Sequence, residues 1–299
     1  MIRSWKSILL LIWLSQFFAM AAFSSAYTFI PFYLKHIGVP GDRLSWYVAL
    51  FSASGNLSFA IASPIWGMIA DIYGRRPMLL RANFAAALLI PLMGLITNPD
   101  LLIVHRFVLG AMAGTVTASQ TLILSTTPGQ NRSFALGAIA SALFSGMMVG
   151  QFLGGDVVNY LGFRGTFFLG GALLAIAGGL VLLVHEKFTR PARPLEQIRR
   201  GFAFRLPRFG KVWYLMLLFV SMSLARDFDG PFVPVLVDDI VKDNALALRW
   251  SGHISGFCSA AAILSGLSLG FLADRVKLIT VLLAAILIAG LLRLPQAMA

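Results

Sequence analysis

The sequence has 299 residues, of which 58% are hydrophobic and 12% are charged, with 24 Lys and Arg against 12 Asp and Glu. Soluble domains carry about 45–50% apolar and about 25% charged residues, so a soluble fold of this length is excluded, as are disordered, collagen-like and coiled-coil chains. Cys258 is the only cysteine, which excludes an intrachain disulfide and a thiolate metal cage. The composition predicts a polytopic membrane protein.

Nine charge-free stretches are candidate transmembrane helices, because a helix needs about 20 apolar residues to cross the hydrocarbon core. In chain order they are residues 7–34, 44–70, 82–99, 107–131, 133–155, 165–185, 212–225, 250–273 and 278–292. The fourth is expected to begin near Leu101 and to take Arg106 into the membrane. The seventh is interrupted by Arg226, Asp227 and Asp229 and resumes after them. Backbone polar groups in lipid must bond internally, so an all-α fold is predicted.

The distribution of basic residues predicts the orientation. With the N-terminus in the cytoplasm, 16 Lys and Arg residues lie in the inner segments and five in the outer ones. This bias follows the positive-inside rule for a multi-pass protein of the inner or plasma membrane. The charge of +12 is therefore interpreted as a topology signal and not as a nucleic-acid surface.

The polar stretch 185–211 divides the chain into an N-terminal six-helix bundle, residues 1–184, and a C-terminal part with three helices, residues 212–299. Two pairs of segments recur at one shared offset along the chain: Phe29-Ile-Pro31 with Phe232-Val-Pro234, and 67–71 with 270–274. Repeated halves are a common transporter plan. The repeat predicts three further helices, so the sequence is interpreted as truncated after helix 9, with a nine-helix protein as the alternative.

The most specific local motif is Gly67-Met-Ile-Ala-Asp71-Ile-Tyr-Gly74-Arg75-Arg76, which joins the second and third predicted helices. Gly67 permits close approach of another backbone, and Gly74 permits a tight turn with positive φ. Asp71 is expected to pair with Arg75 or with the N-terminus of a neighbouring helix. Arg75 and Arg76 hold the loop in the cytoplasm. A plain turn with a topology anchor explains the arginines but not the whole spacing.

These residues, with two further stretches, resemble the major facilitator superfamily. The loop resembles its signature between helices 2 and 3, and residues 102–110, with Arg106, resemble its helix 4 motif. Residues 146–155 resemble the helix 5 motif of drug–proton antiporters, except that Gln151 stands where the family has proline. The general pattern is most similar to bacterial multidrug efflux members. The resemblance implies two six-helix halves that rock about a central cavity.

The helix 5 motif also has a packing interpretation. Gly146, Gly150 and Gly154 are spaced by four residues, which places them on one helix face, and Gly155 follows directly. Small residues on one face let helices pack closely in lipid. Packing and gating are left open as alternatives.

Four charged residues are candidates for coupling or substrate binding. Arg106 lies six residues after Asp100, roughly 9 Å into its helix, so it faces a cavity or snorkels to the surface. Arg226 and Asp229 can pair on one face, which leaves Asp227 as a titratable group. A structural ion pair is the alternative. Intramembrane charges are functional hypotheses by default, so Asp227 and Asp229 are predicted to handle protons.

The predicted function is proton-coupled efflux of small amphipathic compounds or drugs by a secondary transporter. The alternatives are uptake of a nutrient or metabolite, and a truncated remnant that does not transport. No metal-ligand spacing, phosphate loop or catalytic set is present in the sequence, so no cofactor, metal or enzymatic activity is predicted. The expected partners are a small-molecule substrate, protons and the lipid bilayer. A monomer is expected.

Overall fold

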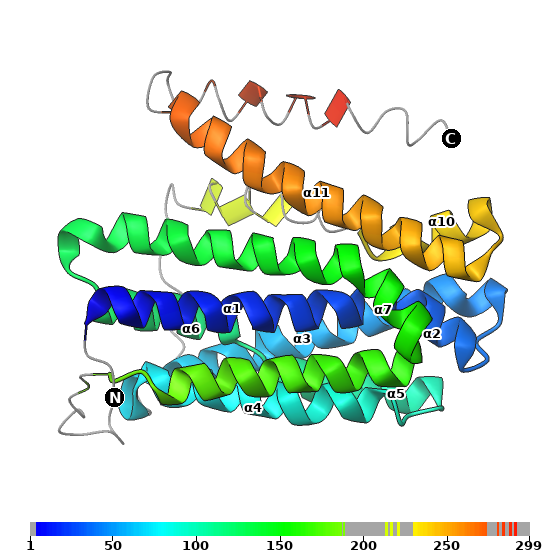
Figure 1. Ribbon diagram of the computed structural model, residues 1–299, viewed down its shortest axis with the longest axis horizontal. Coiled ribbons are helices and arrows are strands. Elements are labelled where there is room, and N and C mark those ends of the chain that lie inside the picture. The colour runs from blue at the N-terminus through cyan, green and yellow to red at the C-terminus, as the bar shows by residue number, and fades with distance from the viewer. Residues whose placement is uncertain are drawn as a thin grey trace.

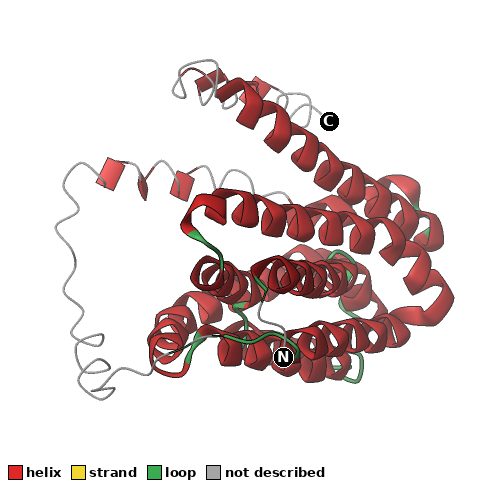
Figure 2. Ribbon diagram, turned by 60° about the vertical axis from the view of Figure 1, so that its left-hand side comes forward, coloured by secondary structure: helices red, strands yellow, loops and turns green. Residues whose placement is uncertain are grey.

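The computed structural model describes residues 4–186 and 230–273, together with scattered positions between 188 and 221 and between 280 and 291. Within these ranges the chain is helical apart from short turns, and they contain no β-strand. The helices lie roughly side by side along the long axis of the molecule (Figure 1, Figure 2). The predicted all-α class is confirmed.

The first predicted spans form four helices. α1 (Trp5–Tyr27) continues after a short turn as α2 (Ile30–His36), and α3 (Gly41–Tyr73) and α4 (Arg75–Met93) follow. Pro31 stands in the first turn of α2, where its missing N–H interrupts no helical hydrogen bond. The 23 residues of α1 measure about 35 Å at 1.5 Å per residue, enough for a hydrocarbon core of about 30 Å.

The fourth predicted span is a broken helix. It consists of α5 (Pro99–Ala111) and α6 (Thr115–Thr126), and the early start expected near Leu101 is confirmed. The side chain of Asn98 caps α5 by accepting hydrogen bonds from the first backbone N–H groups. The break falls at Gly114, whose φ of 125° is open to glycine but strained for other residues.

The fifth and sixth predicted spans are joined without a loop. A short 3₁₀ turn, η1 (Gly129–Asn131), leads into α7 (Arg132–Leu182). Gly162 interrupts α7 with φ 68° and ψ 174°. At this point the chain doubles back, as the green ribbon in Figure 1 shows. The N-terminal half contains five apolar segments long enough to cross a membrane. Gly162 divides the last of them, Gly129–Leu182, into two helices, which gives six crossings.

The described C-terminal part repeats the beginning of the chain. It consists of η2 (Gly230–Phe232), α10 (Val233–Val241) and α11 (Asn244–Ala273). The start of α10 follows the start of α2 by the same offset that separates the starts of α3 and α11. The offset found in the sequence thus recurs in the starts of two helices, which supports the internal repeat. The stretch predicted to resume helix 7 is here a separate short helix, α10, just as α2 follows α1.

Buried contacts centre on α7, which packs against α1, α4 and α11. Most buried side chains are apolar, but Ser15 and Asn83 are fully buried. Ser15 Oγ donates to the carbonyl of Ala177 at 2.9 Å, and Asn83 Nδ2 donates to Ser15 Oγ at 3.4 Å. These bonds join α1, α4 and α7 inside the bundle, where a polar group without a partner would be costly.

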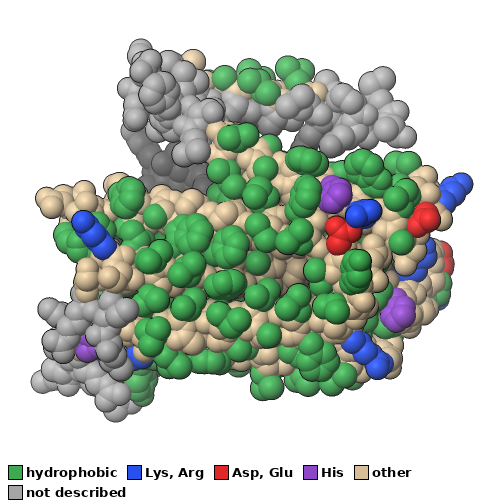
Figure 3. All heavy atoms as spheres, viewed as in Figure 1, with side chains coloured by type: hydrophobic (Ala, Val, Ile, Leu, Met, Phe, Trp, Pro, Cys, Tyr) green, Lys and Arg blue, Asp and Glu red, His purple; other side chains and the backbone are tan. Residues whose placement is uncertain are grey.

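The surface of the bundle is suited to lipid. Apolar side chains cover its sides, and charged side chains gather toward its two ends (Figure 3). Leu57, Leu88 and Phe134 are 59%, 66% and 67% exposed. We call the end with the α3–α4 turn the loop end and the end with α2 and α10 the cap end.

Candidate functional site

Gly74 forms the turn of the signature loop. α3 ends at Tyr73, Gly74 adopts φ 98°, and α4 begins at Arg75. The positive φ expected at Gly74 is confirmed. Gly67 is exposed, and no described atom would lie within 4 Å of a Cβ added there, so the expected backbone approach is not seen among the described residues.

A carboxylate that sequence analysis did not single out holds this loop in place. Glu186 accepts hydrogen bonds from the backbone N–H of Arg75 at 3.0 Å and of Arg76 at 2.7 Å. The guanidinium of Arg76 donates to the carbonyls of Val181, at 3.3 Å, and Leu182, at 2.9 Å. The start of α4 is therefore bound to the end of α7. No spacing in the sequence marks Glu186, because it lies far along the chain from the loop that it holds.

Asp71 does not have the expected partner. Its side chain is exposed and makes no hydrogen bond or ion pair with the residues that the structure describes. The N-terminus of α4 is occupied by Glu186 instead, and Arg75 contributes its backbone and not an ion pair with Asp71. The physical reason is position, because a carboxylate beyond α7 faces the free N–H groups of α4 directly.

Arg106 points into the bundle instead of snorkelling to its surface. Its Nη1 donates to the hydroxyl of Tyr27 at 3.0 Å, and its guanidinium lies 4.4 Å from the ring centre of Tyr27 and 5.2 Å from that of Phe51. Gly55 leaves room for the guanidinium, since a Cβ there would meet it. Nε of Arg106 is buried without a hydrogen-bond partner among the described residues. The cation is held by two aromatic faces, each worth about 0.5–2 kcal/mol.

The other coupling candidates are not described. Arg226, Asp227 and Asp229 lie outside the described residues. Asp274, the last residue of the repeated segment 270–274, lies outside them too. Their roles remain predictions. Among the described residues no group of three His, Cys, Asp or Glu is placed to hold a metal ion.

The glycines of the helix 5 motif face two different neighbours. A Cβ on Gly146 or Gly150 would meet the α1 carbonyls of Phe17 or Ala21, and a Cβ on Gly154 would meet the ring of Phe29. Gly155 instead lies against the backbone of Leu248 in α11. The stripe thus provides close packing on α1, and Gly155 extends it to the C-terminal part.

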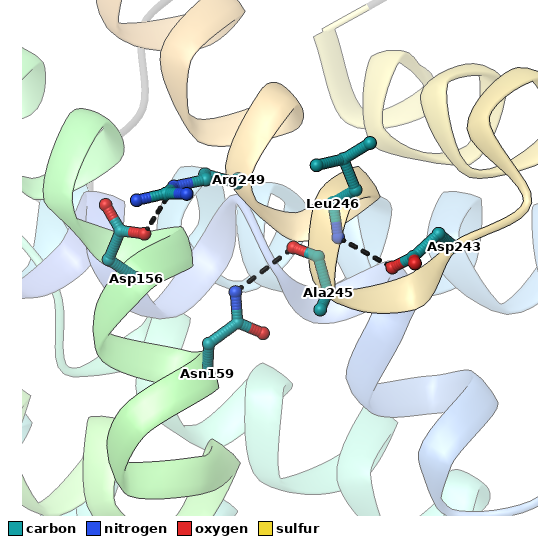
Figure 4. A network of polar contacts seen from close by, with 6 residues as sticks. All are labelled: Asp156, Asn159, Asp243, Ala245, Leu246 and Arg249. Carbon is teal, nitrogen blue, oxygen red and sulfur yellow. Dashed lines mark hydrogen bonds and ion pairs between the residues drawn. The ribbon is translucent and has the colours of Figure 1, made fainter.

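Polar contacts join the two halves near the cap end. We call this interface of α2 and α7 with α10 and α11 the inter-half seam. Asp156 forms an ion pair with Arg249, in which Oδ1 and Nε lie 2.8 Å apart. Asn159 Nδ2 donates to the carbonyl of Ala245 at 3.1 Å (Figure 4). Asp156 and Arg249 lie far apart in the chain, and folding brings them together.

Two more seam contacts were not expected. Lys35 pairs with Asp238 at 2.7 Å, and the two residues stand at equivalent positions of the repeat. Ser259 Oγ donates to Gln151 Oε1 at 2.6 Å. Gln151, which departs from the family's proline, therefore links α7 to α11. The repeat offset is the signal that would have found the first pair.

The seam closes one end of the described bundle. Asn159 contacts Ala245 near the cap end, and Gly252 lies against the Gln151 carbonyl further along. Toward the loop end α11 diverges from α7 (Figure 1).

Comparison with known proteins decides the family. A sequence profile of the Major Facilitator Superfamily matches residues 12–298. The chain belongs to the Major Facilitator Superfamily. Its members are transporters and not enzymes, so this chain is an integral membrane transporter, as the sequence analysis expected.

Its superfamily relatives include drug-resistance proteins. The chain is 31% identical to the multidrug resistance protein MdtG of Enterobacter lignolyticus (strain SCF1), over 98% of this chain and 71% of that protein. It is 28% identical to the multi-drug resistance efflux pump PmrA homolog of Lactococcus lactis subsp. lactis (strain IL1403), over 98% of this chain and 73% of that protein. The predicted resemblance is confirmed.

Solved superfamily structures share the fold. The nucleoside transporter NupG covers 90% of this chain with a TM-score of 0.65 at 16% identity, with 68% of that chain matched. The D-xylose-proton symporter covers 88% of this chain with a TM-score of 0.64 at 15% identity, with 69% of that chain matched. At these identities the likeness concerns the fold alone.

Proposed function

We propose that this protein exports small amphipathic compounds, including drugs, across the inner membrane in exchange for protons. The support for export comes from relatives that are named for multidrug resistance. They are about 31% identical to this chain over 98% of its length. Arg106 between Tyr27 and Phe51 supports a binding role, since aromatic faces and a cation together suit amphipathic compounds.

The observation that carries the proposed mechanism is the one-sided seam. Contacts between α7 and α11 join the halves near the cap end, while the two helices diverge toward the loop end. The charge bias supports a cytoplasmic location of the loop end. In the proposed cycle the seam parts when the loop end closes, so that the two sides open in turn. Such exchange of open sides is alternating access.

In this proposal the intramembrane charges couple transport to protons. Asp227 and Asp229 take up and release the proton, and Arg106 binds substrate or lowers the pKa of a nearby carboxylate. A potential of 100 mV supplies about 2.3 kcal/mol per charge, which corresponds to roughly a fortyfold gradient. Gly67, Asp71, Gly74, Arg75 and Arg76 govern opening of the cytoplasmic side, with Glu186 fixing the loop to the N-terminal half.

Uptake is the second candidate, because the solved structures that share the fold include a nucleoside transporter and a D-xylose-proton symporter. A remnant that does not transport is the third candidate, and one experiment distinguishes all three.

The experiment measures dye accumulation in cells that lack their own drug pumps. Cells with this chain are compared with empty-vector cells and with cells that express MdtG as a positive control. Export predicts lower accumulation of an amphipathic dye, and a protonophore should abolish the difference. Equal accumulation with and without the chain contradicts export. Faster entry of a sugar or nucleoside favours uptake, and absence of any flux favours the remnant.

A substitution isolates the proton step. Asp227→Asn is expected to flatten the dependence of transport on pH, because the variant cannot titrate there, whereas Ser221→Ala, in the same predicted helix, should keep it. The measurement is the initial transport rate between pH 5.5 and pH 8. Identical profiles for the two variants would remove Asp227 from the mechanism.

A further inference from the structure

A cavity of about 470 Å³ opens at the cap end of the inter-half seam. Its walls come from both halves: α2, the turn of α7 around Gly162, and the first turns of α11. The lining residues used below are Tyr33, His36, Asn159, Phe163, Arg164 and Leu248. The volume lies within the range of about 300–1,000 Å³ that is typical of small-molecule sites.

The charge of this cavity favours an anion. Arg164 is exposed, lines the cavity and makes no ion pair among the described residues. Two other cations of the seam are already neutralised, Lys35 by Asp238 and Arg249 by Asp156. No Asp or Glu of the described chain lines the cavity. Asp243, beside the lining, accepts from the backbone N–H of Leu246 and caps α11.

One wall is aromatic. The ring of Phe163 lies 5.4 Å from that of Tyr33 and 5.2 Å from that of His36, measured between ring centres. The hydroxyl of Tyr33 donates to the carbonyls of Met93 and Ile96, so it is not free to bond a ligand. Asn159 is fixed by its bond to Ala245. A cation beside an aromatic wall suits a flat organic anion.

We propose that this cavity binds a small amphipathic organic anion, with its anionic group at Arg164 and its apolar body against Phe163, Tyr33 and His36. Because Leu248 and Asn159 come from opposite halves, the cavity is complete only while the seam is closed. A ligand that binds one conformation better shifts the population toward it. The anion therefore stabilises the closed seam and slows transport. The binding claim does not depend on export or on proton coupling.

The test uses two probes of equal shape, 2-naphthoate and the neutral 2-naphthamide, with the purified full chain in phosphatidylcholine nanodiscs. Equilibrium dialysis is expected to show naphthoate bound about tenfold more tightly than naphthamide, which corresponds to about 1.4 kcal/mol. Arg164→Gln should abolish this preference and Arg164→Lys should keep most of it. Arg43→Gln, an exposed arginine in α3 that does not line the cavity, is the matched control and should leave it unchanged.

A second variant tests the two-sided wall. Leu248→Trp fills the cavity from α11 and should weaken naphthoate binding with Arg164 intact, provided that size-exclusion chromatography shows a folded protein. If it does not fold, Leu248→Ala should lower the affinity for both probes by removing wall surface. Equal affinity for the two probes in the wild type, or the same loss in Arg164→Gln and Arg43→Gln, would overturn the proposal.

The same assay identifies the source of the anion. Nanodiscs with phosphatidylglycerol should compete with naphthoate in an Arg164-dependent way if a lipid headgroup occupies the cavity. Unchanged naphthoate affinity in these nanodiscs assigns the cavity to a soluble anion. Both results support an anion site in the cavity, and they differ only in which anion occupies it.

Discussion

Single residues decide how the signature loop is held. Gly74 makes the turn because a positive φ is open to glycine, and Glu186 then receives the two N–H groups that the start of α4 leaves free. The arginines of the motif act unequally: Arg76 uses its side chain on the α7 carbonyls, while Arg75 contributes its backbone N–H. The loop is thereby part of the N-terminal bundle.

Glu186→Ala is expected to lower the free energy of unfolding by about 1–2 kcal/mol, because two N–H groups of α4 lose a charged acceptor. Glu186→Gln should lose less than half of that, since its amide oxygen still accepts. Thermal unfolding in detergent measures both. Asp71→Ala is the control, because exposed Asp71 makes no described contact, and it should unfold like the wild type. A matching loss in Asp71→Ala would contradict the capping role of Glu186.

Substitutions of Arg106 and Tyr27 separate the contributions of the cation and of the hydroxyl group to ligand binding at the candidate site. Tyr27→Phe keeps the aromatic face and removes the hydroxyl acceptor, so dye affinity should fall only a few-fold, for a loss of about 1 kcal/mol. Arg106→Gln removes the positive charge beside both rings and should reduce the affinity for an anionic amphipathic dye by tenfold or more. Dye binding to the purified protein, followed by fluorescence polarisation, is the measurement. Unchanged binding in Arg106→Gln would show that this arginine is structural.

At the scale of helices, α7 owes its central place to residues without side chains. In lipid, apolar surface gives no preference for another helix over a lipid tail, so contact depends on how closely the backbones approach. Gly146 and Gly150 allow α1 to approach, and Gly155 and Gly252 allow α11 to approach. The helix 5 motif therefore has a structural role in the contacts of α7 with α1 and α11, whatever part it also takes in gating.

Gly150→Ala and Gly137→Ala form a matched pair within α7. A Cβ at position 150 meets the carbonyl of Ala21, and overpacking of this kind costs about 1–3 kcal/mol. At position 137 nothing described lies within 4 Å, so alanine should stabilise the helix by up to about 1 kcal/mol. The unfolding midpoint in detergent should fall for the first variant and hold or rise for the second. Equal shifts in both would contradict the packing role of Gly150.

For the whole molecule, the repeat brings equivalent positions together. Lys35 and Asp238 occupy the same place in their halves and pair across the seam. An ion pair with Lys35 55% exposed contributes about 0–1 kcal/mol, so it biases the seam without locking it. This modest strength is suited to the opening of the seam that the proposed transport cycle requires.

Charge exchange tests this pair. In a Cys258→Ser background with Ser251→Cys, which places a thiol at a buried position of α11, a membrane-impermeant maleimide reports opening of the seam. Lys35→Asp should raise the labelling rate up to about fivefold, as like charges then face each other. Adding Asp238→Lys should restore the original rate. Failure of the double exchange to restore it, or an equal rise in Arg43→Asp, would exclude the pair from the seam.

The sequence by itself determined the class and the spans of the N-terminal half and predicted the repeat, because lipid demands long apolar helices and the charge-free stretches are visible in one dimension. It also predicted the turn at Gly74, since a positive φ is a local property. Only the tertiary structure decided that Glu186 caps α4, that Asp156 meets Arg249, and that Arg106 lies between Tyr27 and Phe51. These contacts join residues far apart in the chain, and which charge meets which depends on how the helices rotate and pack.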